Sequence, residues 1–146
     1  MGLDFTYLFG SADGRINRAK WWTGALILLI VWTIVEAIFG GSAFGSFLVV
    51  LVTLAIAYPA YAICAKRFQD RNKPAITALY GVGPLLLASL LQSFGLTGSP
   101  AGLNAVGWIC VLITWGVGLW FLIELGLLKG TPGPNSYGGD PLFAVR

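Results

Sequence analysis

Long apolar runs alternate with short polar segments along the chain. Four runs of about 20 residues are almost free of charged side chains, and they extend over Trp21 to Phe39, Phe44 to Ala65, Ala75 to Phe94 and Ala105 to Leu128. At about 1.5 Å per residue, a helix of this length crosses a hydrocarbon layer roughly 30 Å thick. The pattern predicts an all-α integral membrane protein with four transmembrane helices, arranged as two hairpins.

The composition supports this prediction and leaves little room for a soluble domain. Of the 146 residues, 57% are hydrophobic and 10% are charged, whereas soluble domains contain roughly 25% charged residues. The mean hydropathy is +0.80. Outside the runs lie an N-terminal segment, residues 1–20, and a Gly/Pro-rich tail, residues 129–146. We expect a single domain over residues 1–146, with its N-terminal segment at the membrane interface.

The positive charges fall on one side of this predicted domain. They precede the first run, separate the second from the third and follow the fourth, whereas the segments GGSAFGS and SFGLTGSPAGLN carry no charge. The positive-inside rule then places both termini in the cytoplasm. Because topology accounts for the net charge of +3, nucleic acid is not an expected partner. The nine cations are Arg15, Arg18, Lys20, Lys66, Arg67, Arg71, Lys73, Lys129 and Arg146.

Two tryptophans, Trp21 and Trp22, directly follow the first cations. Indole rings favour the boundary between headgroups and acyl chains, and nearby cations attract anionic headgroups. We therefore expect both rings to be interfacial anchors, with ligand stacking as the alternative. A basic stretch before an apolar run can also mark a signal peptide, but this run is too long, so we expect the helix to be retained.

Prolines occur within the second and third runs, at Pro59 and Pro84. Proline removes a backbone donor and clashes with the carbonyl four residues earlier, so we expect both helices to be broken. Broken helices near the membrane midplane can expose backbone groups to a transported substrate. Glycine and proline are nevertheless frequent in membrane helices, where small residues permit close packing. Packing is the favoured interpretation, and a substrate site is the alternative.

Metal and cofactor chemistry is not expected. The chain has no histidine, which is the commonest metal ligand and general base. Its two cysteines, Cys64 and Cys110, fall in opposite leaflets, too far apart for the Cα separation of about 4.4–6.8 Å that a disulfide requires. The glycine-rich tail lacks the Gly-Lys-Ser/Thr ending of a phosphate-binding loop. We therefore assign no catalytic, metal-binding or cofactor-binding residue.

Two carboxylates, Glu36 and Glu124, lie within the apolar runs, where ionisable residues are functional candidates. Glu36 falls near the uncharged end of the first helix and Glu124 near the basic end of the fourth, so they cannot form an acid–base pair, and the protein is not expected to be an enzyme. We expect Glu124 to pair with Lys129 or with a cation of residues 66–73, and Asp70 to form a local ion pair. Glu36 lacks an obvious intramolecular partner and could meet a lipid amine, a water-filled cavity or another subunit.

Three segments of the chain, GRINRAKWW, KRFQDRNKP and KGTPGPNSYGGDP, are similar to motifs of domain-of-unknown-function family 805, the YhaH-like small bacterial inner-membrane proteins. The chain has Phe68 and Gln69 where the family often has leucine and histidine. The resemblance implies a bacterial inner-membrane location and supports four helices. It implies no mechanism, but it points to the basic side as the working surface.

These features suggest a non-enzymatic accessory or organising subunit without cofactors. Its basic face would bind anionic lipid, a larger membrane protein complex or a second copy of the chain. The simpler interpretation is that the cations only set the topology. The alternative function is a small oligomeric transporter or channel component that uses the broken helices and Glu36. The residues predicted to bind lipid or a partner are Arg15, Arg18, Lys20, Lys66, Arg67, Arg71 and Lys73.

Overall fold

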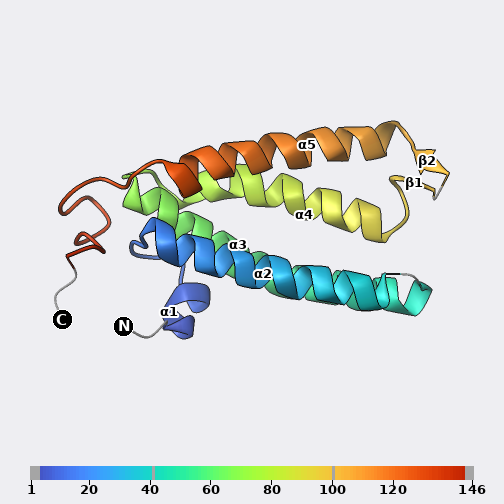
Figure 1. The fold of residues 1–146 in the computed structure, drawn as a ribbon, viewed down its shortest axis with the longest axis horizontal. Coiled ribbons are helices and arrows are strands. Elements are labelled where there is room, and N and C mark those ends of the chain that lie inside the picture. Colours follow the sequence, from blue (N-terminus) through green and yellow to red (C-terminus); the bar gives the residue numbers. More distant parts are fainter. Residues whose placement is uncertain (1–3, 41, 100, 144–146) are drawn as a thin grey trace.

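The computed structural model describes residues 4–40, 42–99 and 101–143 as a mostly helical bundle (Figure 1). Among these residues, four helical segments are long and apolar enough to cross a membrane, as predicted: Arg18–Phe39, Phe44–Asp70, Ala75–Ser93 and Ala105–Leu127. The elements are α1 (Phe5–Gly10), α2 (Arg18–Phe39), α3 (Ala43–Asp70), the 3-10 helix η1 (Ala75–Ala78), α4 (Leu79–Ser93), β1 (Gly98–Ser99), β2 (Gly102–Leu103), α5 (Ala105–Phe121) and the π-helical turn η2 (Leu122–Leu127).

Two helical hairpins, α2–α3 and α4–α5, form the bundle and pack together mainly through α3 and α4. The short antiparallel pair β1–β2 closes the second hairpin. Helix α1 and the segment after η2 lie at the same end of the bundle, on the left of Figure 1. We call this the basic end, and the opposite end, with the α2–α3 turn and β1–β2, the distal end.

Local sequence signals explain where the long helices begin. Helices α2, α3 and α5 start after Asn17, Ser42 and Asn104, and each of these side chains accepts a hydrogen bond from the backbone N–H three residues later. Such caps satisfy one of the donors that a helix N-terminus leaves without an intrahelical partner.

Helix α3 is longer than the second apolar run and continues to Asp70 instead of ending at Ala65. The apolar run measures only the part inside the membrane, whereas the helix stops near Asn72, which has a positive φ of 59° and lies two residues before Pro74. At about 1.5 Å per residue, its 28 residues extend about 42 Å, so its last turns project beyond a hydrocarbon layer of roughly 30 Å. The predicted basic loop is therefore partly helical.

Helices α3 and α4 continue through Pro59 and Pro84, so the breaks predicted there are not observed. A break would leave further backbone N–H and C=O groups without hydrogen-bond partners in hydrocarbon. Each such group costs several kcal/mol, which is about the cost of keeping a proline inside the helix. The helix therefore tolerates the single lost hydrogen bond.

The buried apolar core lies mainly at the basic end, and Trp21 belongs to it. Trp21 is 5% exposed and packs in one cluster with Leu8, Ile63 and Phe121. The indole rings of Trp21 and Trp22 meet edge to face, with centroids 5.1 Å apart. Trp21 is therefore a packing residue covered by the folded N-terminal segment, and the interfacial position predicted for the two rings stays a prediction. The exposed ring of Trp22 remains available at the interface.

The side of the membrane on which the basic end lies remains a prediction that labelling can test. In a variant with both native cysteines replaced, a cysteine at Ser99 should react with a membrane-impermeant maleimide added outside intact cells, and one at Ser136 should react only after lysis. The physical reason is the retention of Lys- and Arg-rich segments in the cytoplasm. The opposite labelling pattern would contradict this orientation.

Candidate functional site

The last turns of α3 carry charged side chains into the protein interior. All residues from Ala62 to Asp70 are buried, and Lys66 and Arg67 are 0% exposed. Fully buried charges are rare unless they are paired. The partners of these side chains therefore show whether the charges stabilise the fold or are free to bind a ligand.

Asp70 is the centre of a buried charge cluster that we call the arginine clamp, formed by Arg15, Arg67 and Asp70. Its Oδ1 accepts a hydrogen bond of 3.0 Å from Arg15 Nε, and its Oδ2 pairs with Arg67 Nη1. The predicted local ion pair of Asp70 is thus present with Arg67, and Arg15 adds a second cation from a distant part of the chain. The clamp ties the N-terminal segment to the end of α3.

Both guanidinium groups of the arginine clamp also bind backbone carbonyls near the C-terminus. Arg15 donates to Thr131 O at 2.7 Å, Gly133 O at 2.8 Å and Gly138 O at 3.0 Å. Arg67 donates to Leu125 O at 2.8 Å and to Leu128 O. The planar guanidinium, with five fixed donors, suits such multiple contacts. These bonds hold the tail, residues 128–143, against α3.

The tail in turn covers the end of α3. Thr131 donates from its backbone N and its hydroxyl to Asp70 O, at 2.8 and 2.9 Å, and Asn135 Nδ2 donates to Gln69 O at 2.9 Å. These carbonyls belong to the last turn of the helix, which has no intrahelical donors for them. The tail therefore acts as the C-terminal cap of α3.

Asp140 closes the tail onto itself. The backbone N–H groups of Leu142 and Gly133 each donate to its carboxylate at 2.9 Å. These two bonds hold the pKa of Asp140 below its ordinary value, because they favour the charged form. The Gly/Pro-rich tail, predicted only as successive turns, is thus an ordered structural segment at Asp140.

Lys66 fixes α1 on the side of α3. Its Nζ donates to the carbonyls of Tyr7 and Leu8, the latter at 2.8 Å, and lies 4.5 Å from the centroid of the Tyr7 ring. The Tyr7 hydroxyl donates to Arg15 O at 3.2 Å, and burial raises the pKa of this phenol. Lys66 therefore serves the packing of the N-terminal segment.

Glu124 accepts the second group of cations. Lys73 Nζ forms an ion pair and hydrogen bond with its carboxylate, and Arg71 Nε lies 3.0 Å from Glu124 Oε1 without the alignment of a hydrogen bond. Of the two expected partners, the basic segment is therefore correct and Lys129 is not. Glu36 lies near the distal end of α2 and is partly exposed, far along the bundle from these cations.

The seven cations predicted to form one continuous surface are thus divided into three groups. Arg15, Lys66 and Arg67 are interior, because they bind carbonyls of α1, η2 and the tail. Arg71 and Lys73 pair with Glu124, and Arg18 and Lys20 lie closer to the surface. The seven cations therefore do not form one exposed surface, and their binding of lipid or a partner stays a prediction.

The prediction omitted Lys129, which is exposed and lines the same hollow as Arg18, a cavity of about 600 Å³ at the basic end. Asn17, Thr131 and Asp140 are also among its lining residues. Lys129, Thr131 and Asp140 belong to the segment KGTPGPNSYGGDP, and this motif was the feature of the sequence from which their role could have been predicted. In the part of the chain that the structure describes, no three His, Cys, Asp or Glu side chains gather as a metal site.

The three segments with characteristic sequence therefore meet at one end of the bundle. Neither curated proteins nor solved structures yielded a match to the chain. A family model described as "Protein of unknown function (DUF805)" matches residues 9–139, a range that includes the first two segments and most of the tail. The chain is therefore a member of the DUF805 family.

Proposed function

We propose that this protein is a non-enzymatic accessory or organising subunit of the bacterial inner membrane, and that its basic end binds anionic lipid headgroups. The observation that carries the proposal is the division of the cations described above. Three of them saturate interior partners, while Arg18, Lys20 and Lys129 remain closer to the surface, two of them beside a cavity of about 600 Å³.

The outer cations of the cavity offer chemistry that suits a phosphate group, because the two carboxylates in its lining, Asp70 and Asp140, are occupied by the arginine clamp and by backbone N–H groups. Arg18 is exposed and uses Nη1 for one hydrogen bond of 2.9 Å, to Leu127 O, so other donors of its guanidinium group can reach a ligand. Lys129 is exposed and adds an ammonium group with three donors, and the exposed ring of Trp22 supports an interfacial position. Each cation near an anionic membrane surface contributes on the order of 1 kcal/mol.

Neutralising the outer cations should remove the preference for anionic lipid. The variant Arg18→Gln/Lys20→Gln/Lys129→Gln would be placed in nanodiscs that contain equal amounts of phosphatidylglycerol and phosphatidylcholine. Native mass spectrometry would then count the lipids of each kind that the protein retains on release from the nanodisc. At about 1 kcal/mol per cation, we expect the preference to fall by up to roughly 100-fold, and to weaken with added salt in the wild type.

The matched control is Arg71→Gln/Lys73→Gln, which removes cations that pair with Glu124. It should retain the wild-type lipid preference, as should Glu36→Gln at the distal end. If the triple variant retains phosphatidylglycerol like the wild type, the outer cations serve only topology and the proposal fails. Co-purification in mild detergent tests the partner complex separately.

The transporter or channel alternative has less support. The broken helices on which it relied continue through their prolines, and Glu36 lies away from the charged groups of the basic end. An uptake assay in liposomes would revive it if a solute crossed in a protein-dependent manner.

A further inference from the structure

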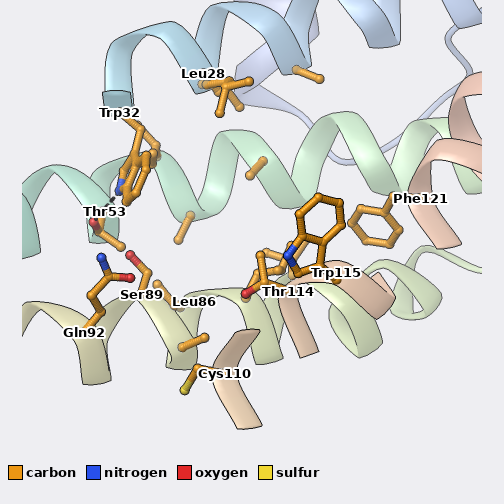
Figure 2. Close-up of a pocket in the computed structure, with 18 of the residues that line it drawn as sticks. Leu28, Trp32, Thr53, Leu86, Ser89, Gln92, Cys110, Thr114, Trp115 and Phe121 are labelled. Atoms are coloured by element: carbon orange, nitrogen blue, oxygen red, sulfur yellow. Dashed lines mark hydrogen bonds between the residues drawn. The ribbon is translucent and has the colours of Figure 1, made fainter. Parts of the chain in front are cut away.

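A second cavity lies between the two hairpins in the membrane-crossing part of the bundle (Figure 2), and it opens to the outer surface, since the exposed side chains of Leu29 and Trp115 are part of its lining. Its volume is about 710 Å³, within the range of roughly 300–1,000 Å³ that is typical of small-molecule sites. All four long helices contribute lining residues, and every described residue that lines it is uncharged. A ligand in this cavity must therefore be neutral, because a charged group would be desolvated without a counter-charge.

Polar side chains from three helices gather toward one end of this cavity. Figure 2 shows Trp32 of α2 and Thr53 of α3 joined by a hydrogen bond, with Ser89 and Gln92 of α4 at the same end. Trp32 Nε1 donates to Thr53 Oγ1 at 3.3 Å. Thr53 lies about 15 Å along α3 from Ala43, and hence near the middle of a hydrocarbon layer roughly 30 Å thick.

Two hydroxyl groups of this cluster have unused donors. Ser89 Oγ is buried and has no hydrogen-bond partner within residues 4–40, 42–99 and 101–143. Thr53 is 4% exposed and accepts from Trp32. By contrast, Thr33 on α2 and Ser93 on α4 donate to the carbonyl four residues earlier. A buried polar group without a partner costs about 1–3 kcal/mol, so its presence here needs an explanation.

We propose that the cavity binds a neutral lipophilic molecule whose carbonyl oxygen accepts hydrogen bonds from Ser89 and Thr53. The apolar lining accommodates the body of such a molecule, and the two hydroxyl groups, which are buried in the wall of the cavity, would turn toward its oxygen and fix its position. The ester carbonyls of bilayer phospholipids do not match, because they lie roughly 15 Å from the midplane, beneath polar headgroups. This site is separate from the basic end and does not rest on headgroup binding there.

Benzophenone is a suitable probe because it is a neutral diaryl ketone that forms covalent bonds with nearby C–H groups under ultraviolet light. The full-length protein in nanodiscs would be irradiated over a range of benzophenone concentrations, and labelled residues identified by peptide mass spectrometry. We expect saturable labelling of cavity-lining residues of α3 and α4. Unsaturable labelling spread over the outer surface of the bundle, as at Leu112 and Leu119, would overturn the proposal.

The hydrogen bonds are tested by Thr53→Val/Ser89→Ala, which preserves the shape of the cavity. Losing two net hydrogen bonds should raise the concentration for half-maximal labelling about tenfold. The matched control, Thr33→Val/Ser93→Ala, makes the same changes at hydroxyl groups outside the lining and should label like the wild type. Equal labelling by both variants would show that the cavity accepts any apolar molecule, and would overturn the assignment of a carbonyl ligand.

A competition experiment on the wild type gives the same answer without a variant. Diphenylmethane has nearly the shape of benzophenone but lacks the carbonyl oxygen, so its apparent affinity in blocking benzophenone labelling of the cavity should be about tenfold weaker than the affinity of benzophenone itself. Equal competition would contradict the proposal even if the variants failed to fold.

Discussion

Replacing Asp70 with asparagine is expected to destabilise the protein by about 3–5 kcal/mol, because the buried guanidinium groups of Arg15 and Arg67 would lose their shared counter-charge. In a thermal unfolding experiment in detergent, this loss should lower the apparent melting temperature by on the order of 10 °C. Asparagine keeps the size of the side chain, so the effect reports charge and hydrogen bonding more than packing.

Asp13→Asn provides the matched control, since Asp13 is exposed in the same N-terminal segment. It should change the free energy of unfolding by less than about 0.5 kcal/mol. Similar melting temperatures for Asp70→Asn and the wild type would mean that water reaches the arginine clamp, and that the tail is not held by a buried charge cluster.

The four membrane-crossing helices could be predicted because hydrocarbon imposes a simple rule on the sequence. Every spanning helix needs about 20 apolar residues, whatever its neighbours are. The end of α3 could not be read from the same rule, since hydrophobicity marks the membrane and not the helix. A signal for the helix end was nevertheless present in the sequence. Asparagine adopts the left-handed conformation seen at Asn72 more readily than most residues, and Pro74 cannot continue the helix.

The burial of Lys66 and Arg67 was not predictable from local sequence. A run of cations beside an apolar segment is typical of a solvated loop, and only the partners reveal otherwise. Apart from Asp70, which pairs with Arg67 locally, those partners are the carbonyls of Tyr7, Leu8, Leu125 and Leu128, far away along the chain. Every residue has a backbone carbonyl, so the sequence does not show which carbonyls accept hydrogen bonds from Lys66 and Arg67. The role of the glycine-rich tail as a hydrogen-bond acceptor was therefore not predictable.

Trp21 illustrates the same limit for apolar side chains. Its position after three cations is typical of an interfacial anchor, and Trp22 beside it remains exposed. Trp21 is buried and Trp22 is exposed because α1 and α3 cover only one face of α2 at the basic end. The intramembrane cavity was equally hidden, since Thr53 and Ser89 are ordinary residues of two separate apolar runs until α3 packs on α4.

Replacing Arg15 with lysine is expected to cost about 2–4 kcal/mol although the charge is kept. The Arg15 guanidinium reaches Asp70 and three tail carbonyls from one plane, whereas a lysine ammonium is a single point with three donors. Thr131 O and Gly133 O are part-buried and would lose their donor, at a desolvation cost of about 1 kcal/mol or more each, whereas Gly138 O also accepts from the backbone N–H of Asn135. Thermal unfolding and the rate of tryptic cleavage at Lys129 would measure the loss.

Arg18→Lys is the matched control for this substitution. Arg18 lies three residues away, is exposed and makes one hydrogen bond to Leu127 O, which lysine can replace, so its effect should stay within about 0.5 kcal/mol. Both variants keep the net charge and the charge asymmetry from which the orientation in the membrane is predicted. Equal effects would therefore show that Arg15 contributes only charge, whereas faster release of the tail in Arg15→Lys alone would separate its structural role from topology.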